Sequence, residues 1–159
     1  DMLDPDAPWF VLGEGELAYE PLEDGDTVDL VLGPQGAWMF PMPLRGGNFT
    51  IPEDPLDWQH PDAPKLSVIF DIDGFDPSFG EYFFEMHDYP VPLDVLEDET
   101  YEFIYVAVIA PDGWYTVCDI HGSQGHVSAY LEISDQSEPL SFELDLNIAV
   151  PMPIGEPCE

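Results

Sequence analysis

Tyr115–Ile133 reads YTVCDIHGSQGHVSAYLEI, and both the fold and the candidate chemistry of this chain depend on how this stretch is interpreted. It holds one of the two cysteines, two of the four histidines and a Gly-x-Gln-Gly turn. Trp114–Ile120 before the turn and Val127–Ser134 after it are short apolar segments typical of strands. The stretch therefore predicts a strand, a tight turn and a second strand.

The same pattern recurs along the chain. Eighteen prolines and thirteen glycines fall between short apolar runs, as expected for the turns of a β-protein. We predict an all-β fold, an antiparallel immunoglobulin-like β-sandwich of about 8–10 strands, with a small barrel as the alternative. We expect residues 1–159 to form a single domain with extended termini. The clearest further strands are Thr27–Leu32, Ala37–Leu44, Leu66–Asp73, Thr100–Ala110 and Leu140–Val150.

The charge is extreme, with 34 acidic residues against Arg45 and Lys65 and a net charge of -32. Such a chain repels phosphate, so nucleic acids and anionic lipid are poor partners. No apolar run has membrane-spanning length, and we expect no membrane insertion. Three interpretations of the acidity stay open: adaptation to high salt, bound cations with Ca²⁺ foremost, or a surface that only aids solubility.

Leu12–Leu44 carries a recognisable order of motifs: a Gly-rich opening, Glu20-Pro21-Leu22, an Asp-Gly-Asp turn, a strand, and GPQG at Gly33–Gly36. This order resembles secreted or lipoprotein-like β-sandwich proteins of myxobacteria and relatives. Their motif continues Gly-x-His, where this chain has Ala37 and Met39. Val127–Val150 resembles the immunoglobulin-like ending of the same proteins. The resemblance implies an envelope-associated immunoglobulin-like fold and implies no activity.

A second resemblance is chemical. Cys118, His121 and His126 have the spacing Cys-x2-His-x4-His. It is similar to the Cys-x2-His-x4-Met loop that closes the copper site of cupredoxins, with His126 in place of the methionine. His121 and His126 are therefore candidate copper or zinc ligands, joined by Met39 or His87. The alternative is that they are turn histidines, exposed or hydrogen-bonded to the backbone. The chain continues for 33 residues beyond His126, where a cupredoxin is almost complete.

The two cysteines also have a plainer interpretation. A disulfide between Cys118 and Cys158 would tie the C-terminal tail to the core and closes a loop of about 40 residues. A metal-binding thiolate or a buried free thiol at Cys118 are the alternatives. One disulfide predicts an oxidising compartment, extracellular or in the cell envelope. The chain opens at Asp1 rather than methionine, as a mature form without its signal would.

Asp71, Asp73 and Asp76 are the candidate calcium ligands, because they cluster where a strand gives way to a turn. Calcium needs six or more oxygen ligands, and Glu81 or Glu85 could add to the three. The twelfth position counted from Asp71 is a tyrosine, so the cluster is not an EF-hand loop. The alternative is a set of solvent-exposed acids at a strand end.

Catalysis has little support in the sequence, because no Gly-x-Ser-x-Gly elbow is present. We therefore expect a non-enzymatic extracellular or envelope module, either a binding domain or a subunit of a surface assembly that could form filaments. Exposed strand edges would allow a protein partner or another copy to pair. The alternative function is a cupredoxin-like copper protein for electron transfer or metal handling.

Overall fold

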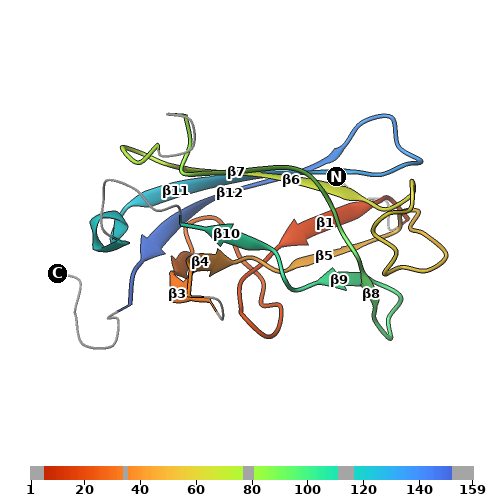
Figure 1. Cartoon of the computed structure of the whole chain (residues 1–159), viewed down its shortest axis with the longest axis horizontal. Helices are drawn as coiled ribbons and strands as arrows, with labels where there is room; N and C mark the ends of the chain where they lie inside the picture. Colours follow the sequence, from red (N-terminus) through yellow and green to blue (C-terminus); the bar gives the residue numbers. More distant parts are fainter. Residues whose placement is uncertain (1–5, 34–35, 77–80, 111–116, 152–159) are drawn as a thin grey trace.

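The structure, a computed structural model, describes residues 6–33, 36–76, 81–110 and 117–151. Over these residues the chain is all-β, which confirms the predicted class, and has twelve strands and one 3-10 turn (Figure 1). No described helix is long and apolar enough to cross a bilayer. The elements are β1 (Trp9–Leu12), β2 (Thr27–Asp29), β3 (Val31–Leu32), β4 (Trp38–Pro41), β5 (Leu44–Gly47), β6 (Lys65–Ile72), β7 (Phe84–Pro90), β8 (Asp94–Val95), β9 (Tyr101–Phe103), β10 (Ala107–Ile109), η1 (Val117–Ile120), β11 (Gln124–Glu132) and β12 (Leu140–Ala149).

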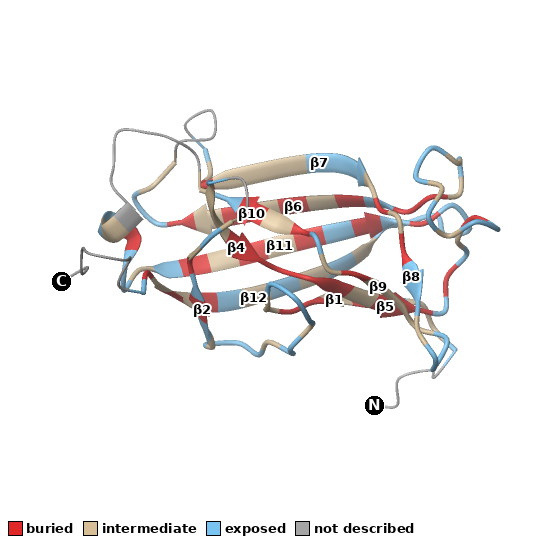
Figure 2. Ribbon diagram, turned by 60° about the horizontal axis from the view of Figure 1, so that its bottom comes forward, coloured by how far each residue is buried: buried red, intermediate tan, exposed pale blue. Residues whose placement is uncertain are grey.

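One layer is a five-stranded sheet with the order β2-β12-β11-β6-β7. Neighbouring strands in this sheet are antiparallel, except that β2 runs parallel to β12. At its centre Val127 of β11 pairs with Leu144 on one side and Phe70 on the other. Side chains of β6 and β11 alternate between buried and accessible, because the strand period of two directs every second residue to the core (Figure 2).

The opposite layer is built from a four-stranded sheet, β1-β5-β9-β8, and a three-stranded sheet, β10-β4-β3. β4 leads into β5, and β9 leads into β10, so these four strands are parts of two long, bent strands. The Met42 N–H donates to the Val106 carbonyl at 2.9 Å and joins the two parts at the bend. The prediction of about 8–10 strands counted each bent strand once.

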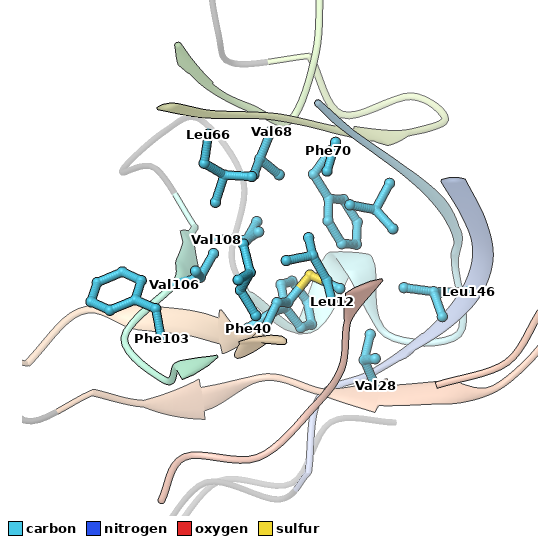
Figure 3. Packing of buried hydrophobic residues seen from close by; sticks show 14 of the residues in the cluster. Leu12, Val28, Phe40, Leu66, Val68, Phe70, Phe103, Val106, Val108 and Leu146 are labelled. Carbon is cyan, nitrogen blue, oxygen red and sulfur yellow. The ribbon is translucent and has the colours of Figure 1, made fainter. Parts of the chain in front are cut away.

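The core lies between the layers and is closed by aromatic rings. Phe40 of β4 stacks on Phe70 of β6 with ring centroids 5.4 Å apart and planes 7° apart (Figure 3). Phe83 meets both rings edge-on at 6.4 Å and 6.1 Å. All three side chains are fully buried. The rings therefore connect the two layers directly, as expected for a β-sandwich.

The Gly-x-Gln-Gly segment, residues 122–125, was predicted to be a turn, but only its first half turns the chain, because its last two residues belong to β11. Gly122 has φ 80°, a left-handed conformation that glycine adopts readily. Gly125 instead lies inside β11, where a Cβ would come within 2.7 Å of the Phe70 ring. The second glycine is needed for close packing rather than for turning the chain.

The strand predicted at Trp114–Ile120 is wrong where the structure describes it, since Val117–Ile120 form a 3-10 turn. The His121 N–H donates to the Cys118 carbonyl at 3.1 Å, and the Ser123 N–H donates to the Ile120 carbonyl at 3.0 Å. These local bonds satisfy the backbone without a neighbouring strand. The buried Ile120 side chain anchors the turn to the core.

Candidate functional site

His126 lies on the outer face of the five-stranded sheet, surrounded by carboxylates from two neighbouring strands. Strand register pairs it with Asp71 of β6 and with Asp145 of β12. Its Nδ1 is 2.8 Å from Asp145 Oδ1, and its Nε2 is 3.3 Å from Glu143 Oε1. We call Asp71, His126, Glu143 and Asp145 the acidic face.

The electrostatics of the acidic face favour a charged imidazole. The hydrogen bond to Asp145 raises the pKa of His126 above its usual value, partial burial opposes this, and the bond to Glu143 adds to it. Partial burial also raises the pKa of Asp71, helped by the charges of Asp76 and Asp73 and opposed by His126. The imidazolium can donate from both ring nitrogens to carboxylates, whereas the neutral ring can donate from one only. Protonation of His126 therefore links β11 to β12 and reduces repulsion among the acids.

We predict that His126→Gln lowers the free energy of unfolding near pH 5.5 and has little effect near pH 9. A raised folded-state pKa gives stabilisation that is complete below the unfolded value, about 6.5, and is lost as pH rises through the folded value. Urea unfolding of both proteins at about pH 5.5 and about pH 9 measures the difference. Tyr130→Gln, on the same strand face, is the matched control. An equal loss at both pH values would contradict the prediction.

The structure does not assemble the copper site implied by the cupredoxin resemblance. His121 Nδ1 accepts a hydrogen bond from the Val150 N–H at 2.9 Å, and both ring nitrogens of His126 face carboxylates. Met39 lies on β4 in the other layer, with the core between it and His126. His87 Nε2 is 3.1 Å from Glu85 Oε1 on β7. The four side chains belong to separate places, so copper binding stays a prediction without geometric support.

The candidate calcium ligands are near one another but do not form a ready site. The charges of Asp76 and Asp73 raise the pKa of Asp71, as expected for carboxylates at one strand end. In the described part of the chain, no group of three His, Cys, Asp or Glu side chains is placed to hold a metal ion. Asp71, a candidate calcium ligand, and His126, a candidate copper ligand, lie side by side on adjacent strands.

We expect NaCl to raise the melting temperature, and Ca²⁺ at matched ionic strength to add nothing further. Na⁺ screens repulsion among 34 acids in proportion to ionic strength, whereas a calcium site would stabilise by mass action at micromolar to millimolar Ca²⁺. Differential scanning fluorimetry in NaCl and CaCl₂ series distinguishes the two. A rise specific to Ca²⁺ that Asp71→Asn abolishes would establish the calcium site instead.

The disulfide prediction involves one described residue. Cys118 lies in η1, next to the buried Ile120. Cys158 lies outside the described residues, so its bond to Cys118 stays a prediction. A bond at this position would fasten the C-terminal segment to the turn that precedes β11.

The outer side of the three-stranded sheet differs from the acidic face, because the paired strand residues there carry no charge. On the outer side of the three-stranded sheet, Met39 of β4 pairs with Val31 of β3 and with Ile109 of β10, and Pro41 pairs with Ala107. Phe40 and Val108, which alternate with them, are fully buried in the core. Ile109, an apolar residue with apolar neighbours, is 44% exposed to solvent. Pro41 is buried, so the accessible residues of this surface are Val31, Met39, Ala107 and Ile109, which we call the acid-free strip.

The strip was missed in the sequence, although a signal for it was present. Leu30–Leu44 and Phe103–Ala110 contain no charged residue, in a chain in which 23% of residues are charged. Their apolar character identified both runs as strands but did not show which side chains face outward. The pairing of β4 with β10, which the sequence does not reveal, brings the two uncharged runs together on the outer side of the sheet.

Charged and aromatic groups border the acid-free strip. A hollow of about 220 Å³ beside Val31 and Pro41 is also lined by carboxylates. Burial, and then the charges of Glu20, Asp29 and Asp26, raise the pKa of one of them, Glu14. The acidic residues lining the hollow are Glu14, Glu16, Glu20 and Asp29.

Two further groups lie in the same layer as the strip. Arg45 Nε bonds Glu102 Oε2 at 2.7 Å on the neighbouring β5–β9 pair, so this pair adds little net charge. Tyr105, which is 74% exposed, lies between β9 and β10 with its ring 5.9 Å from that of Phe103. The strip is thus an apolar surface with acids along one border and an exposed aromatic ring near one end.

Comparison with known protein families and with curated proteins gave no match to this chain. The resemblances to myxobacterial envelope proteins and to cupredoxins therefore stay predictions. Function has to be inferred from the two unlike faces of the sandwich.

Proposed function

We propose that the protein is a non-enzymatic binding module of the extracellular space or cell envelope, and that it docks a protein partner through the acid-free strip. The observation that carries the proposal is the juxtaposition of two uncharged runs, Leu30–Leu44 and Phe103–Ala110, on one outer sheet face. A surface that only aided solubility would carry its acids on every accessible face.

The composition of the strip supports protein docking. Interface centres are depleted of charged residues and enriched in aromatic residues and methionine, and their rims are polar. The strip has Met39 on its central strand, Tyr105 near one end and carboxylates along one border. Exposed apolar patches with polar rims mark protein interaction sites.

The extracellular location rests on different support. The predicted Cys118–Cys158 disulfide requires an oxidising compartment, and the motifs of Leu12–Leu44 resemble envelope proteins. A binding module needs no cofactor, and the proposal assigns none.

Site-specific photo-crosslinking tests the docking surface without knowledge of the partner. A benzophenone amino acid replaces Ile109 on the strip or, as the matched control, Tyr130 on the outer face of the five-stranded sheet. Both residues are partly exposed, at 44% and 37%. On the cells that produce the protein, we expect a discrete protein adduct from position 109 and none from position 130. Adducts from position 130 alone, or equal labelling at both positions, would contradict the proposal.

A further inference from the structure

We infer that the partner on the acid-free strip is a second copy of this chain, so that two sandwiches associate with their strips facing each other. This inference rests on the proposed function and specifies the partner of the same surface. It concerns the strip residues Val31, Met39, Ala107 and Ile109.

The distribution of charge favours a second copy over a basic partner. Each chain has a net charge of -32, so two copies repel each other over most of their surfaces. A basic partner would be attracted to the acids and would have no need of a surface without them. A like-charged partner can make close contact only where acids are missing. The strip meets that need, since both runs that form it are uncharged.

The geometry of the strip suits a symmetric contact. Met39 is on the central strand, and Val31 and Ile109 flank it on the two neighbouring strands. In a two-fold arrangement the same surface is used by both copies, so Met39 lies near the axis and meets its counterpart. Sheets pack face to face through interleaved apolar side chains about 10 Å apart. Methionine fills irregular gaps at such contacts because its side chain is unbranched and flexible.

The acidic border makes this association dependent on salt. Glu14, Glu16 and Glu20 line the hollow beside the strip, so facing strips bring two such borders closer together. Screening extends over about 10 Å at 0.1 M salt and about 3 Å at 1 M. Repulsion between the borders therefore falls steeply over this range, while apolar contact is retained. The structure thus predicts association that strengthens as NaCl is added.

Sedimentation velocity of the purified chain between about 0.1 M and about 2 M NaCl tests the inference. Ile109→Glu places a carboxylate on the strip, and Tyr130→Glu adds the same charge to the other outer face. We expect wild type and Tyr130→Glu to change from the mass of one chain to that of two as NaCl rises. Ile109→Glu should weaken association by at least about tenfold, because facing strips would bury an unpaired carboxylate.

Circular dichroism and thermal melts show whether each variant is folded. Tyr105→Glu, at a more exposed position near the end of the strip, replaces Ile109→Glu if that variant does not fold. A mass of one chain at every NaCl concentration would overturn the inference. Association that Tyr130→Glu breaks and Ile109→Glu leaves intact would overturn it as well.

The two proposals fail in different ways. If the purified chain stays single while position 109 crosslinks to a different protein, the second copy is excluded and the docking surface stands. If the chain stays single and position 109 gives no adduct, both proposals are excluded. If position 109 gives an adduct between two copies, both are supported.

Discussion

Phe40→Ala is expected to lower the free energy of unfolding by about 3–5 kcal/mol, a large share of the 5–15 kcal/mol usual for one domain. Phe40 is fully buried, stacks on Phe70 at 5.4 Å and meets Phe83 edge-on. The substitution loses the free energy gained by burying a large ring. It also leaves a cavity between the two layers, because paired strands cannot easily move to fill it. Urea unfolding monitored by circular dichroism gives the difference.

Tyr130→Ala is the control for Phe40→Ala. Tyr130 is also aromatic and also on a strand, but it faces outward and is 37% exposed. We expect its removal to cost less than about 1 kcal/mol, as is usual for surface substitutions. Equal losses in the two variants would mean that the ring stack between the layers does not hold the sandwich together.

Loss of the predicted Cys118–Cys158 disulfide is expected to have the second largest effect, about 3–4 kcal/mol. In the chain-entropy model, the bond stabilises the folded state by restricting the unfolded chain over a loop of about 40 residues. The double variant Cys118→Ser/Cys158→Ser should therefore melt at a lower temperature than wild type. Reduction of wild type should lower its melting temperature to that of the variant.

Thiol titration of the denatured, unreduced protein checks the bond itself. We expect no reactive thiol, because each of the two cysteines would be part of the bond. Two titrating thiols would disprove the disulfide and would make the thiolate copper site worth testing again. Visible absorption after addition of Cu²⁺ would then be the measurement to make.

The sequence predicted well those strands that have one buried and one accessible face. Leu66–Asp73 and Leu140–Val150 became β6 and β12 with almost unchanged ends. Alternation directly reports which side of such a strand faces the core. Thr100–Ala110 lacks alternation, and the turn between β9 and β10 within it has no glycine or proline to mark it. The prediction of one continuous strand there missed the bend that divides it into β9 and β10.

The candidate surfaces depend on pairing between strands that are distant in the sequence. His126 and Asp71 were both singled out, but for different metals, because nothing local places them on adjacent strands. Asp145, which gives His126 its shorter bond, belongs to a third strand. Register of this kind is fixed by the whole sheet rather than by any one segment. The acid-free strip likewise arises only when β4 pairs with β10.

Hydroxyl-radical footprinting most directly tests the claim that the protein docks through the acid-free strip. The side chains to follow are Met39 and Tyr105 for the strip and its end, and His126 and Tyr130 for the outer face of the five-stranded sheet. Reactivity is compared between the protein on the cells that carry it and the dilute purified chain in low salt. The predicted result is protection of Met39 and Tyr105 on the cells, with His126 and Tyr130 equally reactive in both samples. Protection of His126 and Tyr130 with Met39 and Tyr105 unchanged would contradict the claim.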